Sequence, residues 1–162
     1  MTAAPTLRLR SIFELLSERF FVPSYQRGFR WTARQVEALL DDLAAFQLSS
    51  RQGSPNSFYC LQPVVVRRRS ENEWELVDGQ QRLTTIFLIL RALREVAALL
   101  NRGCYEISYQ TRDGSAAFLK DPTPEGATQY IDYHYMYGAY VAIERWFRER
   151  DGAVRLRLLD CL

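Results

Sequence analysis

One apolar run, LTTIFLILRALREVAALL from Leu83 to Leu100, limits most strongly what this chain can fold into. Its aliphatic residues recur at helical spacing and predict a helix from about Gln80 to Leu100. Charged residues at Arg91, Arg94 and Glu95 interrupt the run, so we expect a helix buried in a folded domain and not a membrane span. The expected buried face consists of Leu83, Ile86, Phe87, Leu90, Leu93 and Ala97.

The 162 residues are enough to bury such a helix inside one domain. Capping-box spacing predicts two helices before it, one opened by Ser11 with Glu14 and one by Thr32 with Gln35. Short apolar segments bounded by turn residues predict strands, and two later segments are typical of helices. The expected strands are 58–69, bent at Pro63, 73–77 and 104–110; an extended segment is expected near 19–22, a helical turn at 116–120 and a helix at 130–150.

A polar turn, Asp78 to Arg82, separates the strand predicted at 73–77 from the apolar helix. A strand-to-helix turn directs backbone N–H groups and the positive end of the helix dipole at one place, which suits a phosphate. Gly79 lets the backbone approach a ligand, Arg82 could fork onto phosphate oxygens, and Asp78 could hold a magnesium ion or orient a water. The other polar groups, which could position that water, read a base edge or donate a hydrogen bond, are Gln80, Gln81, Thr84 and Thr85.

A purely structural interpretation of this turn competes with the phosphate site. Asp78 and Gln81 have the spacing of a capping box. Capping explains one aspartate and one glutamine, but it does not account for both glutamines, Arg82 and the threonine pair together. The turn matches neither GxxxxGK[ST] nor GxGxxG, so neither standard nucleotide motif applies.

A second cluster, FFVPSYQRGFRW from Phe20 to Trp31, alternates aromatic residues with arginines. Such a mixture can stack on bases and hold phosphates. Packing under a loop is the alternative for most of its aromatic residues. Core packing explains Tyr25, Gln26 and Arg27 less well, and these three are candidates for ligand contact.

Weaker candidates lie elsewhere in the chain. Arg112 follows a predicted strand and could reach the same pocket, although an exposed loop arginine is the commoner case. The lone histidine, His134, excludes any site that needs two, and we favour a packed helix residue over a general base. Arg67 to Arg69 end a strand, which is typical of a solvated edge.

Charge and cysteines bound the function only loosely. A net charge of +2 does not by itself indicate a nucleic-acid partner. Lys120 is the only lysine, so arginine supplies nearly all positive charge. Selection for forked contacts with phosphate or carboxylate would produce this excess of arginine, and so would a bias in codon usage. Three scattered cysteines without metal-ligand spacing, and no signal-peptide pattern, favour reduced thiols in the cytoplasm.

With both clusters in view, the chain resembles the N-terminal domain of GmrSD-type restriction endonucleases, a phage-defence family. FVPSYQRGFRW matches that family's pattern aliphatic-Pro-x-Tyr-Gln-Arg-x-aromatic-x-Trp, and DGQQRLTT matches its hallmark motif residue for residue. The resemblance covers roughly Leu7 to Phe147. Many family members carry glycine where Gln62 stands, which is a departure.

The resemblance implies an α+β fold related to the ParB and sulfiredoxin group, with a small mixed sheet flanked by helices and a C-terminal helical part. It implies a domain that binds and hydrolyses a nucleoside triphosphate, coupled to restriction of modified DNA. Carried over by position, Asp78 to Arg82 would form the nucleotide site, and Tyr25 to Arg27 a neighbouring pocket wall or modification-sensing element. Together with the chemistry of these side chains, this leads us to expect Asp78, Gln81 and Arg82 to be catalytic, with Asp78 as ligand of a magnesium ion. The expected nucleotide and phosphate contacts, from the residues and the resemblance together, are Gly79, Gln80, Thr84, Thr85, Tyr25, Gln26, Arg27 and Arg112.

Full-length relatives usually append a histidine-containing nuclease domain. We therefore expect residues 1–162 to be a single domain, cut before a C-terminal helical or nuclease region, that does not cleave DNA alone. The alternative function is a DNA-binding, modification-sensing module without hydrolysis, in which the same turn grips backbone phosphate. A third possibility is a scaffold fragment in which the motifs only maintain structure.

Overall fold

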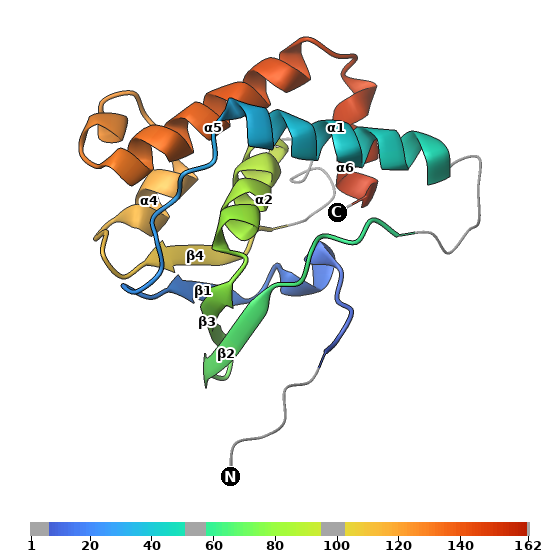
Figure 1. The fold of residues 1–162 in the computed structure, drawn as a ribbon. Coiled ribbons are helices and arrows are strands. Elements are labelled where there is room, and N and C mark those ends of the chain that lie inside the picture. Colours follow the sequence, from blue (N-terminus) through green and yellow to red (C-terminus); the bar gives the residue numbers. More distant parts are fainter. Residues whose placement is uncertain (1–6, 51–57, 95–102, 162) are drawn as a thin grey trace.

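The computed structural model describes residues 7–50, 58–94 and 103–161 (Figure 1). Residues 51–57, whose Gly, Pro, Ser and Asn content predicts a loop, and the part of the predicted helix after residue 94, with Ala97, lie outside these residues. In chain order the elements are η1 (Ile12–Leu15), β1 (Arg19–Val22), α1 (Ala33–Ser50), β2 (Val65–Ser70), β3 (Glu73–Asp78), α2 (Gln80–Ala92), β4 (Glu106–Tyr109), α4 (Ser115–Lys120), η2 (Gly126–Thr128), α5 (Ile131–Arg148) and α6 (Ala153–Cys161).

A mixed sheet of four strands forms one layer of the domain. Its order is β2-β3-β1-β4, with β1 parallel to both β3 and β4, and β2 antiparallel to β3. Figure 1 shows α1, α2, α4 and α5 on the same side of this sheet. The predicted α+β class is confirmed, and the relation to the ParB and sulfiredoxin group stays a prediction.

Strand alternation creates the apolar surface on which the helices pack. In β1, Phe20 and Val22 are buried while the residues between and before them are more exposed, and β4 repeats the pattern at Ile107 and Tyr109. The parallel register places Phe20 beside Ile107 and Val22 beside Tyr109. One apolar layer therefore faces the helices.

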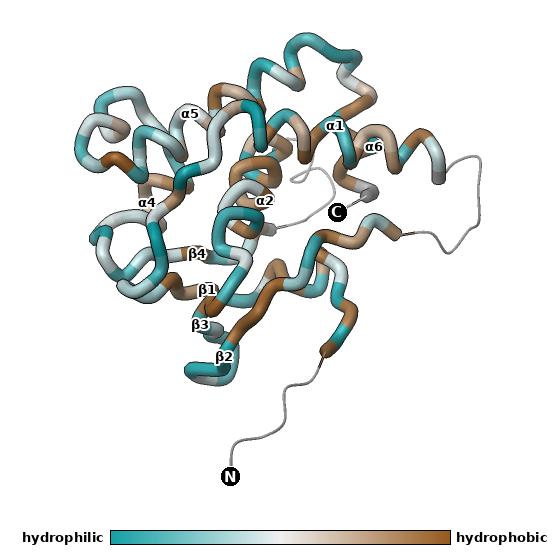
Figure 2. Tube along the Cα trace, in the orientation of Figure 1, coloured by the Kyte–Doolittle hydropathy of each residue, from teal (hydrophilic) through white to brown (hydrophobic). Residues whose placement is uncertain are grey.

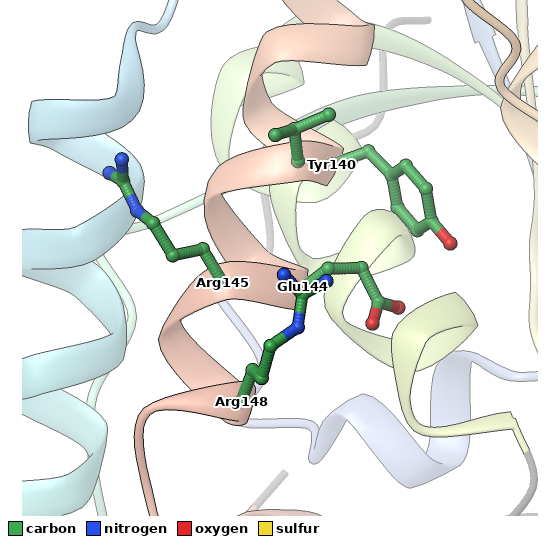
Figure 3. Close-up of a pocket in the computed structure, with 5 residues that line it drawn as sticks. Tyr140, Glu144, Arg145 and Arg148 are labelled. Atoms are coloured by element: carbon green, nitrogen blue, oxygen red, sulfur yellow. The ribbon is translucent and has the colours of Figure 1, made fainter.

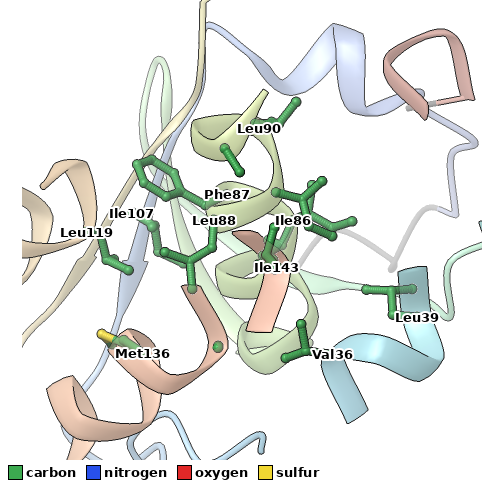
Figure 4. Packing of buried hydrophobic residues seen from close by; sticks show 14 of the residues in the cluster. Val36, Leu39, Ile86, Phe87, Leu88, Leu90, Ile107, Leu119, Met136 and Ile143 are labelled. Carbon is green, nitrogen blue, oxygen red and sulfur yellow. The ribbon is translucent and has the colours of Figure 1, made fainter. Parts of the chain in front are cut away.

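Helix α2 lies at the centre of the core (Figure 4). The predicted buried face is confirmed for every member that the structure describes, but Leu88 and Ile89 are also fully buried. Figure 2 shows the apolar character of α2 between the more polar outer helices. A helix covered on all sides has no polar face, which explains why the predicted stripe was too narrow. Across the described ranges, no helix combines the length and apolar character needed to cross a membrane.

Three local predictions have mixed outcomes. The capping box of Ser11 and Glu14 is present, although the helix that it opens is a short 3-10 helix. The Thr32 backbone N–H donates to Gln35 Oε1 at 2.9 Å, as the second predicted capping box requires. The strand expected from residue 58 is wrong in its first half, because 58–64 is not paired in the sheet and β2 begins after the bend at Pro63.

Candidate functional site

Three loops meet at one edge of the sheet, here called the carboxyl edge. They follow β1 (residues 23–32), β3 (the turn at 78–79) and β4 (residues 110–114), and these strands are mutually parallel. Hydrogen bonds join the loops, since Gln26 Nε2 donates to Val77 O at 2.6 Å and Ser24 N donates to Gln110 Oε1 at 2.8 Å. The structure thus brings both sequence clusters and the Arg112 loop together.

The turn from β3 to α2 is built on Gly79. Its φ of +94° lies in the left-handed region, and it is the N-cap of α2 without a side-chain cap. A Cβ at this position would lie 2.9 Å from Val64 Cγ2, so both conformation and space require glycine. The capping-box interpretation of Asp78 with Gln81 is wrong, because Asp78 precedes the cap and its Oδ1 accepts from Gly79 N at 2.7 Å.

Both glutamines of the motif bind backbone atoms of the β1 loop. Gln80 Nε2 donates to Arg27 O at 2.5 Å. Gln81 Nε2 donates to Gly28 O at 3.0 Å, and its Oε1 accepts from Arg30 N at 2.8 Å. The two residues are only 4% and 8% exposed. Their amides therefore fix the segment from Arg27 to Arg30 against the first turn of α2.

The remaining motif residues also contact protein groups. Arg82 donates from Nη1 to Gln62 Oε1 at 2.9 Å and from Nη2 to Pro63 O at 2.8 Å. Thr84 shares a 2.7 Å hydrogen bond with the Tyr109 hydroxyl, and Thr85 donates to the Gln81 carbonyl at 2.9 Å. Both threonines are fully buried. They lie beneath the carboxyl edge and support it.

A buried aspartate, Asp132, joins the β1 loop and the β4 loop to α5. Asp132 is 1% exposed, its Oδ1 contacts Arg30 Nη1, and its Oδ2 lies 2.8 Å from Arg112 Nε. A Cβ on Gly28 would lie 2.6 Å from Asp132 Oδ2 and closer still to Oδ1.

A signal for this aspartate was present in the sequence. Asp132 falls at helical spacing with the buried residues Met136, Ala139 and Ile143 of α5. An acidic residue on an apolar stripe is rarely buried unless it is paired, so its position indicates cationic partners.

The accessible groups of the carboxyl edge come from the two motif loops. Tyr25 is 64% exposed, and its hydroxyl donates to Glu75 Oε1 at 2.8 Å. Arg27 and Asp78 are exposed, and Arg27 has no ion-pair partner within the described part of the chain. By contrast His134, expected to be packed, is exposed on α5.

Tyr25→Phe is expected to raise the pKa of Glu75 toward its ordinary value. The Tyr25 hydroxyl is the largest of the causes that hold this pKa low, and hydrogen bonding and charge from Arg67 add to it. A lowered pKa means that ionised Glu75 stabilises the fold above its unfolded-state pKa, and that this contribution is lost as the pH falls. A carbon-13 NMR titration of the Glu75 carboxyl measures the shift. Tyr59→Phe, which removes a hydroxyl bonded to Asp42, is the control. An unchanged Glu75 pKa in Tyr25→Phe would contradict the role given to the Tyr25 hydroxyl.

A separate hollow of about 380 Å³ lies on α5 (Figure 3). Figure 3 shows Arg145 directed toward α1, where it contacts Glu37. Because α5 has 18 residues and is about 27 Å long, this hollow near its C-terminal end is remote from Asp132 at its start. Its lining residues are Tyr140, Val141, Glu144, Arg145 and Arg148.

The fold and the carboxyl edge define an α+β domain whose polar, arginine-rich loops follow the parallel strands of a small mixed sheet. Sheets with parallel strands commonly bind ligands at this position. The family model described as GmrSD restriction endonuclease, N-terminal domain, matches residues 9–153. The chain belongs to this family and is a restriction-system domain, which confirms the resemblance found in its motifs. No curated protein matches the chain.

Proposed function

We propose that this domain binds a magnesium–nucleoside triphosphate at the carboxyl edge and hydrolyses it, within a restriction system that acts on modified DNA. The observation that carries the proposal is the convergence of three loops, two of which present Tyr25, Arg27 and Asp78 to solvent. Arginine forks suit phosphate oxygens, and an exposed tyrosine ring suits a base or a modified base. The substrate of the system would be DNA, with cleavage supplied by a nuclease domain.

The side-chain contacts separate the residues of this proposed site that would contact the nucleotide from those that hold the loops in place. Arg27 would contact phosphate directly, joined by Arg112 from the β4 loop. In this proposal Gln81 and Arg82, which were expected to be catalytic, act through the loops that they hold. Gln26 likewise fixes its loop to β3 through the Val77 carbonyl.

Asp78 is the residue that would hold magnesium. Within the part of the chain that the structure describes, no group of three or more histidine, cysteine, aspartate or glutamate side chains is arranged for a metal ion. Magnesium often needs only one or two carboxylates beside substrate phosphates and waters, and one Asp78 oxygen remains after the bond from Gly79. The bound ion would neutralise charge on the phosphates during transfer to water. One free Asp78 oxygen therefore fits a magnesium ion that is already bound to the phosphates of its nucleotide.

The alternative, a DNA-binding module without hydrolysis, draws support from the exposed strand β2. Arg69 lies 3.9 Å from the centroid of the Phe21 ring, and Arg68 lies 5.8 Å from that of Trp74. Acidic partners reduce the free charge of this face, since Arg67 and Arg69 pair with Glu75 and Glu73. We therefore rank it second.

Calorimetric titration with each magnesium–nucleoside triphosphate tests the proposal. Arg27→Ala is expected to weaken binding about tenfold, the effect of one charged phosphate contact. Asp78→Asn keeps an acceptor for the Gly79 N–H but should abolish the dependence on magnesium. Arg34→Ala, which removes an exposed arginine of α1, is the matched control. A folded wild-type domain that binds DNA with a steep salt dependence, and no triphosphate, would instead establish the alternative.

A further inference from the structure

The buried Asp132 has two cationic partners from two different loops. Arg30 belongs to the β1 loop and Arg112 to the β4 loop, and each contacts one oxygen of the carboxylate. Burial of a carboxylate is unfavourable unless the carboxylate is paired, and one guanidinium fork could pair with both of its oxygens. The second arginine is therefore more than pairing alone requires. The arrangement leaves one net positive charge on the cluster of Asp132, Arg30 and Arg112.

Each arginine is held on more than one side. Arg30 Nη1 also donates to Phe29 O at 2.8 Å, and Arg112 Nη1 donates to Thr111 O at 2.7 Å. Two tyrosines of the same chain region, two residues before and three residues after Asp132, lie against the guanidiniums. Arg112 is 4.8 Å from the centroid of the Tyr130 ring, and Arg30 is 5.5 Å from that of Tyr135. The geometry of both forks is therefore fixed before any ligand arrives.

Both arginines keep donors for a ligand. Their Nη2 atoms make no hydrogen bond to any residue that the structure describes. The Arg30 side chain is 36% exposed and that of Arg112 is 25% exposed, so both can be reached from solvent. Gln81 accepts from the Arg30 backbone N–H, which ties this cluster to the start of α2.

We infer that Asp132 is a positioning residue that holds Arg30 and Arg112 as a paired receptor for the terminal phosphate of the triphosphate. This inference rests on the proposed function. A terminal phosphate carries the most charge and presents three free oxygens, so it matches two forks better than an inner phosphate does. Asp132 itself does not touch the ligand.

The test compares the magnesium complexes of a nucleoside triphosphate and of the corresponding monophosphate by calorimetry. Asp132→Asn is expected to weaken triphosphate binding about tenfold or more and to leave monophosphate binding unchanged. Arg112→Lys keeps the charge but removes the fork, and it should give the same selective loss. Asp41→Asn removes a carboxylate bonded to Trp146 and Arg150 near the opposite end of α5, and it should change neither affinity.

The selectivity separates positioning from general damage to the fold. Equal loss for both nucleotides, or no loss for either, overturns the inference while leaving the proposed function in place. A wild-type domain that binds no triphosphate overturns both. If Asp132→Asn does not fold, the selectivity of Arg112→Lys and Arg30→Lys decides, because both side chains are partly exposed.

Discussion

Gly28→Ala is expected to destabilise the domain by about 3 kcal/mol or more, the range found when a buried ion pair loses a partner. The added Cβ would lie 2.6 Å from Asp132 Oδ2 and closer to Oδ1, far inside van der Waals contact. Gly28 is not among the glycines with positive φ, so the expected effect is steric and not conformational.

The collision has no inexpensive relief. Asp132 is 1% exposed and is contacted by both Arg30 and Arg112, so its carboxylate cannot turn aside without leaving a guanidinium. If the loop moves instead, the Gly28 carbonyl leaves Gln81 Nε2. Either movement breaks contacts between the carboxyl edge and a helix.

Denaturant unfolding measures this cost, and Gly138→Ala is the matched control. A Cβ on Gly138 meets nothing within 4 Å, and the residue lies on the exposed side of α5, so alanine there should stabilise the helix by about 0.5–1 kcal/mol. Combining Gly28→Ala with Asp132→Ala should cost little more than Asp132→Ala alone, because the side chain that collides is then absent. Fully additive costs would contradict the steric explanation.

The sequence predicts the elements of the carboxyl edge better than their arrangement. The polar turn between β3 and α2 could be placed from the change of apolar pattern and from Gly79. That the loops after β1, β3 and β4 meet depends on β1 lying between β3 and β4, a long-range pairing that no local pattern encodes. Arg112 could therefore be suggested as a neighbour of the site but not placed in it.

The role of the motif glutamines was hidden for a related reason. Side-chain type shows that Gln80 and Gln81 can donate and accept, but it does not show which partner satisfies them. In the fold those partners are backbone groups of Arg27, Gly28 and Arg30, more than fifty positions earlier in the chain. Two motifs that resemble independent ligand sites in sequence are thus two halves of one hydrogen-bonded structure.

Gln81→Ala is expected to cost about 2–4 kcal/mol of folding free energy. The substitution leaves the Gly28 carbonyl and the Arg30 N–H without their partner, and each unpaired group in a partly buried place costs about 1–3 kcal/mol. The loss should also loosen the β1 loop, because Gln80 would then be the remaining motif amide that holds it.

Urea unfolding of Gln81→Ala beside Gln35→Ala measures this difference directly. Gln35 is also an amide that accepts a backbone hydrogen bond, but it is exposed and its partner, Thr32, is only three residues away. Water can replace that contact, so Gln35→Ala should cost well under about 1 kcal/mol. Hydrogen exchange should rise at the Arg30 amide in Gln81→Ala alone, because this N–H loses its only acceptor among the described residues. Equal losses of unfolding free energy in the two variants would mean that Gln81 does not hold the two motifs together. Other contacts would then have to hold the β1 loop against α2.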